Sequence, residues 1–178
     1  MHTDILDFWF RDTQPAQWWK VDPAFDELVR SRFGVLHAQA CRCELFGWRA
    51  TAEGRLAEVI VLDQFSRNIH RGTPAAFAAD PLALALAQEA VAAGADLALP
   101  PEQRAFLYMP YMHSESPAIH AQAEPLMRER APAHTHAFEL KHKLIIDRFG
   151  RYPHRNAILG RATTAEEAVF LTEPGSSF

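Results

Sequence analysis

Apolar residues recur along most of the chain at spacings of three and four, which is the period of an amphipathic α-helix. Alternating apolar and polar positions, the pattern of a β-strand, are hard to find. The clearest helical stretch follows Asp22-Pro23 and carries apolar side chains at Phe25, Leu28, Val29, Phe33, Leu36 and Ala40. The pattern therefore predicts an all-α protein.

Capping residues mark where the predicted helices begin and end. Asp22-Pro23 and Asp80-Pro81 each place a capping side chain before a proline that suits the first helical turn. Thr164 to Glu167 has the spacing of a capping box. With glycines and prolines as stops, we predict helices over 4–10, 23 to near Gly47, 53–70, 82–93, 102–111, 117–130, 134–150 and 165–171.

No linker, low-complexity tract or shift in composition divides the chain. Its 178 residues are enough for one domain with a substantial core. We expect a single all-helical domain over residues 1–178, built as a bundle or as an array of helical hairpins. The tail over 174–178 is expected to be frayed.

The charged residues bear on the choice of ligand. The net charge of −4 argues against general nucleic-acid binding, because that binding needs a basic face to displace the counterions of phosphate. Only three of the 18 basic residues are lysines, at positions 20, 141 and 143. Arginine suits carboxylate and phosphate groups, so the skew favours an anion-binding protein, although an arginine-rich genome explains it equally well.

Neither a membrane span nor a secretion signal stands out. No uninterrupted apolar run approaches the roughly 18 residues that a span requires, and the first residues lack a basic segment followed by an apolar one. We therefore expect a soluble, cytoplasmic protein with no membrane partner. Cys41 and Cys43 stand two apart in a predicted helix, where their side chains diverge, and the chain has no other cysteine. We expect no disulfide, metal site or cofactor.

The first of three polar clusters ends the predicted helix 53–70. Asp63 and Arg67 are four residues apart, as are Gln64 and Asn68, so each pair can meet on the helix surface. A carboxylate that holds an arginine fork in one orientation prepares it to bind an anion. The alternative is an ion pair that only fixes the next turn of the chain.

The second cluster, His113-Ser114-Glu115-Ser116, follows the very apolar stretch 106–112. A histidine that leaves a buried helix end beside a carboxylate can act as acid or base near neutral pH. Alternatively, Ser114 or Ser116 caps the next helix while His113 binds the last carbonyl groups of the preceding one.

The third cluster is the densest, and Pro153 interrupts it. Proline ends the helix 134–150 and places His154, Arg155 and Asn156 on a loop. A loop this polar between apolar stretches indicates a ligand site, whereas the alternative is a hydrogen-bonded network that clamps the C-terminal helix. The cluster comprises Asp147, Arg148, Arg151, Tyr152, His154, Arg155 and Asn156.

At these clusters the chain resembles a known family. The matching segments are 5–10, 54–57, 62–68, Ala76-Phe77 with Asp80, 106–110 with 113–115, and Tyr152-Pro153-His154-Arg155-Asn156. Together they resemble the bacterial domain-of-unknown-function family 924. The resemblance covers essentially the whole chain and implies an all-helical fold of tetratricopeptide-like, superhelical arrangement. It implies no activity, because none is established for the family.

Three positions depart from the pattern of the family. Glu58 replaces an apolar residue, Ser66 a proline and His70 an aromatic residue. A charge at Glu58 within an apolar seam requires a partner. Ser66 should leave its helix straighter than a proline would. The departures do not touch Asp63, Arg67 or Asn68.

Two hypotheses of function follow. In the first, the chain binds a small carboxylate or phosphate, with acid–base catalysis by His113 or His154 as a further step. Arg67, Arg151 and Arg155 would bind the anion, Asp63 and Asp147 would orient them, and Asn68, Glu115 and Asn156 would complete the site. This requires the three clusters to meet around one cavity, within roughly 10 Å. In the second, the chain is a non-catalytic helical scaffold that binds a peptide or partner protein in a groove.

Overall fold

In the computed structural model, which describes residues 1–177, the chain is helical and none of the described residues lies in a strand. The prediction of an all-α protein is confirmed. The α-helices are α1 (His2–Asp7), α2 (Pro15–Trp19), α3 (Pro23–Cys41), α4 (Ala52–Ile60), α5 (Ser66–Ile69), α6 (Asp80–Ala92), α7 (Pro101–Met112), α8 (Pro117–Arg130), α9 (Ala133–Phe149) and α10 (Ala165–Phe170). Short 3₁₀ segments are η2 (Phe46–Ala50), η4 (Pro74–Phe77), η5 (Ala95–Ala98) and η6 (Pro153–Arg155), and π-helical turns are η1 (Phe8–Asp12) and η3 (Val61–Phe65).

Two of the three predicted caps form. The Asp22 carboxylate accepts hydrogen bonds from the backbone N–H groups of the first turn of α3, at 3.0 and 3.3 Å. Thr164 and Glu167 form the reciprocal capping box of α10. The prediction for Asp80 is wrong: Ala79 holds the cap position and Asp80 is the first helical residue, because its carboxylate pairs with Arg67 instead.

Helix α3 ends earlier than predicted, at Cys41 rather than near Gly47. Cys43 beyond it has a φ of 59°, in the left-handed region that ends a helix. The two cysteines are therefore not on one helix, and the divergence expected for helical positions does not apply to them. Both thiols are free.

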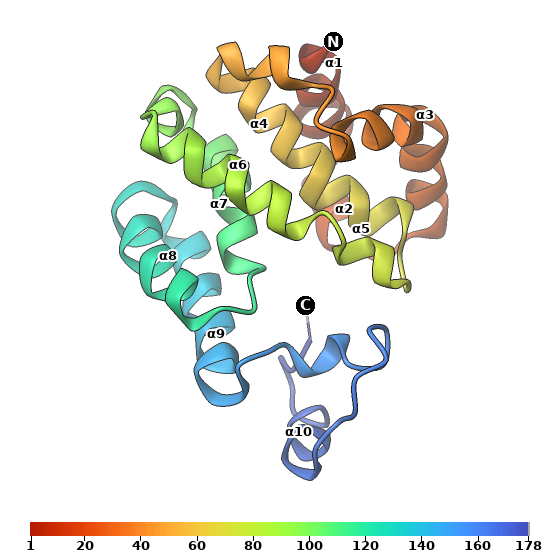
Figure 1. The fold of residues 1–178 in the computed structure, drawn as a ribbon, viewed down its shortest axis with the longest axis vertical. Coiled ribbons are helices and arrows are strands. Elements are labelled where there is room, and N and C mark those ends of the chain that lie inside the picture. Colours follow the sequence, from red (N-terminus) through yellow and green to blue (C-terminus); the bar gives the residue numbers. More distant parts are fainter. Residues whose placement is uncertain (178) are drawn as a thin grey trace.

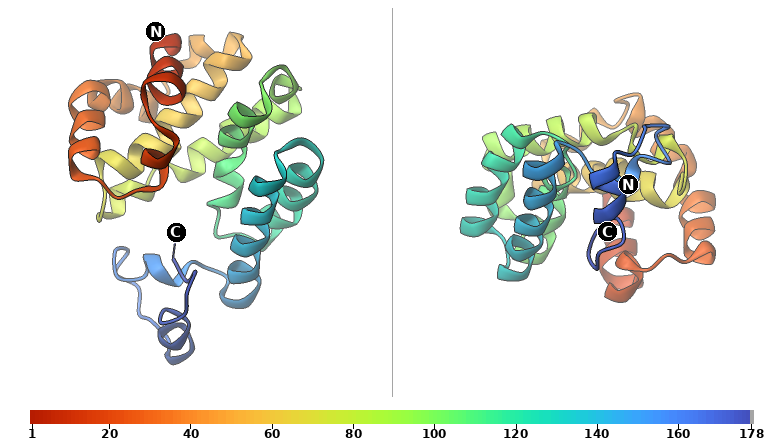
Figure 2. Two further views of the ribbon diagram at one scale, coloured as in Figure 1. Left: turned by 180° about the vertical axis from the view of Figure 1, so that it is seen from behind. Right: turned by 90° about the horizontal axis from the view of Figure 1, so that it is seen from below.

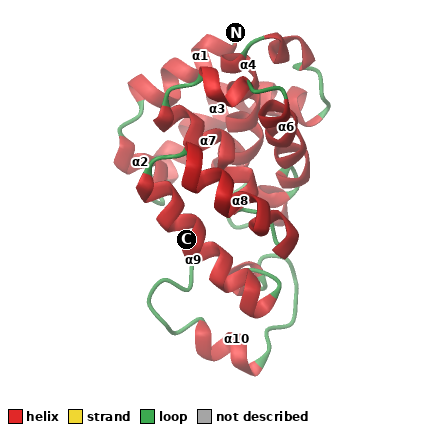
Figure 3. Cartoon of the chain, turned by 90° about the vertical axis from the view of Figure 1, so that its left-hand side faces the viewer, coloured by secondary structure: helices red, strands yellow, loops and turns green. Residues whose placement is uncertain are grey.

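Successive helices pack against one another in a row that curves through the molecule (Figure 1). α4 contacts α1, α6 and α7, α7 contacts α8, and α8 contacts α9 along much of their lengths. The row is seen from behind and from below in Figure 2. The main core lies between α1, α3, α4 and α7, where Trp9, Phe65 and Tyr108 are fully buried. α10 lies at the far end of the molecule, beyond α9 (Figure 3).

A π-helical turn interrupts the helix predicted over 53–70. α4, η3 and α5 run on as one helix, because the residues at both junctions keep helical backbone angles. The wider turn carries Asp63 and Gln64. Ser66 follows it, and its hydroxyl donates to the carbonyl oxygen of Leu62 at 2.5 Å. π-turns within helices are frequent at functional sites, so this segment is a candidate for a functional site.

The stretch Pro74–Ala92 has the length and mean hydropathy, 1.2, of a helix that could cross a membrane. This is weak evidence, because core helices of soluble proteins pass the same test. Ala83, Ala87 and Ala90 of this stretch are fully buried against the neighbouring helices. That arrangement is typical of a helix packed into a protein core.

The structure describes the C-terminal segment as far as Ser177. Ser176, which lies in the segment expected to fray, is buried and its hydroxyl donates to the carbonyl oxygen of Leu171 at 3.2 Å. The expectation for Phe178 lies outside the described residues.

Glu58 has the partner that its charge requires. Its side chain is fully buried, and both carboxylate oxygens accept hydrogen bonds from Arg49, at 2.8 and 2.7 Å. A buried ion pair of this kind contributes little net stability, but removal of one partner leaves an uncompensated charge in the core.

We predict that Arg49→Met lowers the free energy of unfolding by about 3 kcal/mol, because Glu58 is then buried without a counter-charge. The double variant Arg49→Met/Glu58→Leu should recover most of this loss, since an apolar residue suits the seam. Urea denaturation followed by circular dichroism measures both. A double variant as unstable as the single one would contradict the prediction.

Candidate functional site

The centre of the candidate site is the carboxylate of Asp63, buried in the π-turn with a residue exposure of 1%. Its Oδ1 lies 2.7 Å from His113 Nδ1 and 3.2 Å from Arg67 Nη1, and Oδ2 accepts from Gln64 at 2.6 Å. Burial alone would raise the pKa of the Asp63 carboxyl, but the charge of Arg67 and the contact with His113 outweigh it. The net pKa is well below the usual range, so Asp63 is ionised.

His113 stands at the C-terminal end of α7, where its backbone N–H still bonds to the carbonyl oxygen of Met109. An ionised carboxylate only accepts hydrogen bonds, so Nδ1 carries the proton and Nε2 keeps its lone pair. Nε2 forms no hydrogen bond with the described residues, and 17% of the side chain is exposed. Burial, followed by the charge of Arg67, lowers the pKa of His113. Its imidazole is therefore neutral at pH 7.

Asp80 joins two arginines from distant parts of the chain. Arg67 reaches both oxygens of Asp80, at 2.9 and 3.0 Å, and also donates to the backbone oxygen of Asp63. Arg155 approaches Asp80 at 3.5 Å and donates to the backbone oxygen of His113 at 3.1 Å. The first and third clusters therefore meet at one carboxylate.

The Arg155 guanidinium is held by stacking as well as by charge. Its carbon lies 4.6 Å from the centre of the Phe77 ring and 4.7 Å from that of Tyr152. The residue is 6% exposed, and its Nε–H is buried with no hydrogen-bond partner. Burial, followed by the charge of Arg67, lowers the pKa of Arg155. A buried donor without a partner is costly, and it marks a place where an additional acceptor would be stabilised.

Glu115 fastens the loop that follows α9. Its carboxylate accepts from the backbone N–H of Tyr152 at 2.6 Å and from both terminal nitrogens of Arg161, at 2.7 and 2.9 Å. Burial would raise the pKa of Glu115, but Arg161 and Tyr152 hold it below its usual value. The second and third clusters therefore also meet, through the backbone of Tyr152, and the ion pair with Arg161 orders the loop.

The structure thus brings four of the predicted residues into one connected group, namely Asp63, Arg67, His113 and Arg155. Glu115 lies beside them, and the ring of His154 is 5.6 Å from that of Tyr152. Asp80 and Phe77 belong to the same group, and Arg161 binds Glu115 beside it, but none of the three was predicted as a site residue. The signal of Asp80 was weak, because it resembled a helix cap.

The other predicted residues point elsewhere. Asn68 donates to Asp26 at 2.8 Å, on the side of α3, and not to Gln64. Asn156 accepts from Arg161 at 3.0 Å within the C-terminal loop. These two residues order the backbone around the group and do not enter it.

Asp147 was expected to help orient the anion-binding arginines, but it does not pair with Arg151, which lies four residues further on. Asp147 pairs with Lys143, and Arg151 binds Glu167 at 2.6 and 2.8 Å. The reason is the end of α9: Gly150 has a φ of 67°, so the chain leaves the helix before Arg151 and the spacing of four no longer brings the two side chains together. Asp147 therefore cannot orient that arginine.

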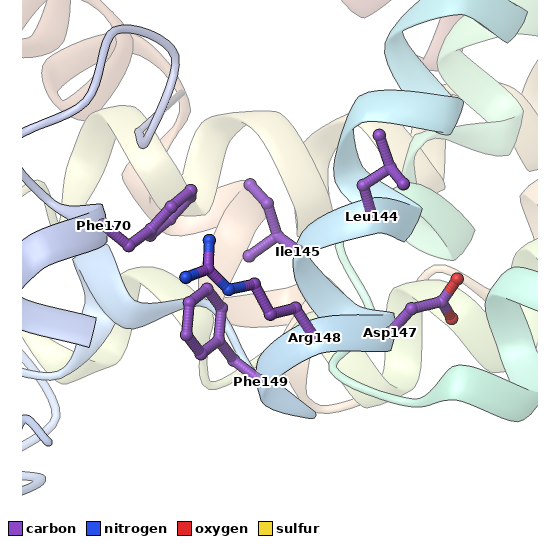
Figure 4. Close-up of a pocket in the computed structure, with 6 residues that line it drawn as sticks. All are labelled: Leu144, Ile145, Asp147, Arg148, Phe149 and Phe170. Carbon is purple, nitrogen blue, oxygen red and sulfur yellow. The ribbon is translucent and has the colours of Figure 1, made fainter. Parts of the chain in front are cut away.

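Two surface hollows lie away from this group. One of about 440 Å³ is lined by Leu144, Ile145, Asp147, Arg148, Phe149 and Phe170 (Figure 4). The other, of about 280 Å³, is lined by His37, Cys41, His70, Ala75, Ala78, Ala79 and Leu82. Residues of the three polar clusters contact one another, but neither hollow is lined by Asp63, His113 or Arg155, so a common cavity stays a prediction.

Comparison with known proteins places the chain in a family. Residues 5–175 match the bacterial proteins of unknown function of family DUF924. The chain belongs to this family. A solved structure, a protein of unknown function from Agrobacterium tumefaciens, is 43% identical, with a TM-score of 0.89 over 96% of each chain. Among curated proteins none matches.

We predict that the pKa of His113 measured by NMR lies below 6.5 and that it responds in opposite directions to its two charged neighbours. Arg67→Ala should raise it, because a nearby positive charge is removed. Asp63→Asn should lower it further, because the stabilising carboxylate is lost. A His113 imidazole that titrates at or above 6.5 in the unaltered protein would contradict this electrostatic arrangement.

Proposed function

We propose that this chain binds a small molecule bearing a carboxylate or a phosphate beside His113, and that His113 exchanges a proton with it. The observation that carries the proposal is the pair of Asp63 and His113, with Nδ1 held by a buried carboxylate and Nε2 without a hydrogen bond to any residue that the structure describes. A fixed tautomer with an open Nε2 is the arrangement that a general base requires.

Arg155 supplies the contact for the anionic group. Its Nε–H has no acceptor, and its plane is fixed between Phe77 and Tyr152, so an incoming oxygen would meet a donor that is already oriented. Arg67 supports the binding of the anion indirectly. Arg67 already binds two carboxylates, so its role is to hold Asp63 and Asp80 in place.

The remaining predicted residues take supporting roles in this proposal. Glu115, Arg151 and Asn156 order the loop that carries Arg155. His154 is the second candidate for proton transfer, but burial lowers its pKa to about 4. His113 is preferred because the buried carboxylate of Asp63 fixes its tautomer.

The test uses two matched arginines. Arg155 and Arg148 each stack on two aromatic rings, but only Arg155 belongs to the group around His113. We expect at least one compound from a panel of small carboxylates and phosphates to raise the melting temperature of the unaltered protein by roughly 5 °C at a concentration far above its Kd. Arg155→Met should abolish this shift, and Arg148→Met should keep it.

His113→Gln separates binding from proton transfer. It should retain the anion-induced shift but remove the part of its pH dependence that comes from protonation of His113, because the titrating group is gone. The exposed His134→Gln serves as control. The proposal fails if no compound of the panel stabilises the unaltered protein, or if Arg148→Met loses the shift as completely as Arg155→Met.

A second function, a scaffold that binds a peptide or partner protein, is favoured by the hollow between α9 and α10. Its lining is mostly apolar and includes the exposed side chain of Leu144 on α9. We include in this proposal the tetratricopeptide-like superhelical arrangement and a cytoplasmic location. The row of packed helices supports the scaffold. A pull-down that requires Leu144, and not Arg155, would favour it over the first function.

A further inference from the structure

The smaller of the two surface hollows lies between α3 and the segment that leads from α5 into α6. Its volume is about 280 Å³. α3 supplies His37 and Cys41, the C-terminal end of α5 supplies His70, and the connection into α6 supplies Ala75, Ala78, Ala79 and Leu82. A hollow of this size has room for a ring compound, since an apolar cavity of about 150 Å³ already binds benzene.

His37 is the most buried polar residue of this lining, with 6% of its surface exposed. Its Nε2 lies 2.7 Å from the hydroxyl oxygen of Ser66. The single hydrogen of that hydroxyl is donated to the carbonyl oxygen of Leu62, so Ser66 accepts from His37 and Nε2 carries the proton. Burial, followed by the charge of His70, lowers the pKa of His37. The ring is therefore neutral at pH 7, and Nδ1 keeps its lone pair.

The lone pair of Nδ1 has no well-aligned donor among the residues that the structure describes. The sulfur of Cys41 lies 3.9 Å from Nδ1 of His37 and 3.7 Å from Nε2. A thiol that donated along the lone pair would be much closer to Nδ1 than to Nε2, because the lone pair points away from the rest of the ring. A buried acceptor without a donor is costly, so a ligand that brings a donor would be stabilised here.

The rest of the lining disfavours a charged ligand and suits a flat apolar one. No carboxylate, arginine or lysine lines the hollow, so a charged ligand would lose hydration without gaining a counter-charge. Three of the lining residues are alanines, whose small side chains leave room for a ring, and Leu82 adds apolar surface. On the polar side the rings of His37 and His70 have centres 5.3 Å apart and are tilted by 59°. Aromatic rings pack well against such rings, edge to face or offset.

We propose that this hollow binds a small uncharged phenol, whose hydroxyl donates to Nδ1 of His37 and whose ring packs against the alanines and Leu82. A phenol combines the properties that the lining favours. It is uncharged at neutral pH, it carries a strong O–H donor, and its body is flat and apolar. The hollow contains none of Asp63, His113 and Arg155, so this site does not depend on the function proposed above.

Fluorine NMR titration of the purified protein at neutral pH tests the site with three probes. We expect para-fluorophenol to bind with a Kd on the order of 1 mM or lower. In para-fluoroanisole a methyl group replaces the donated hydrogen, and this probe should bind roughly tenfold more weakly, because Nδ1 of His37 then has no donor. The anion para-fluorobenzoate should not bind in the hollow, because its charge has no partner there.

Three variants locate the binding. Ala78 is exposed and lines the hollow, so Ala78→Phe fills the hollow without entering the core, and it should abolish binding of para-fluorophenol. The control Ala92→Phe adds the same ring at an exposed position of α6 outside the hollow, and it should leave binding unchanged. His37→Phe should remove the preference for the phenol over the anisole, because the acceptor is gone.

The phenol site is overturned if para-fluorophenol does not bind, if the phenol and the anisole bind equally well to the unaltered protein, or if Ala78→Phe binds the phenol as well as Ala92→Phe does. Binding of para-fluorobenzoate that Ala78→Phe abolishes would also overturn it, since the hollow would then accept an anion. Benzoate binding that survives Ala78→Phe takes place outside the hollow, as expected. If His37→Phe does not fold, the three probes and the two alanine variants still decide the outcome.

Discussion

The arrangement around the candidate site depends on one buried carboxylate. Asp63 is removed from water, so it stays ionised only because a cation and an imidazole approach it from other parts of the chain. Arg67 in turn aligns Asp80, and Asp80 draws in Arg155. The charge thus links the helix that contains the π-turn, the end of α7 and the C-terminal loop. Three segments distant in sequence are held in one geometry by a chain of alternating charges.

The sequence predicted the helices because their signals are local. Apolar spacing and the capping side chains of Asp22 and Thr164 act within a few residues, and the structure has helices in these places. It also singled out Arg67 and Arg155 as residues suited to bind an anion, and His113 as a residue suited to transfer a proton. It missed Asp80, since a carboxylate before proline at a helix start is equally suited to capping, and only the fold decides which bond it makes. The role expected of Asp147, to orient an arginine, depended on the fold in the same way. The end of α9 lies between Asp147 and Arg151, so the two side chains do not pair.

The ion pairs also limit what the site can bind. Arg67, Arg151 and Arg161 each have an internal carboxylate, so an external anion would compete with a partner that is already in place. Arg155 differs, because its contact with Asp80 is long and one N–H has no acceptor. An abundance of arginine is therefore a poor guide to anion binding. A better guide is the number of arginine N–H groups that have no hydrogen-bond acceptor within the fold.

The π-turn at Val61–Phe65 bears on how the site could have arisen. A π-turn accommodates one residue more than the α-helix around it, and each residue of a helix turns the next by about 100°. Removal of a single residue there would restore a regular helix and keep both flanking segments, yet it would rotate Arg67 away from Asp80. The alignment of charges thus requires an insertion and not only suitable side chains. The loss or gain of one residue in this turn would therefore disrupt the site as much as a substitution of Arg67 or Asp80 would.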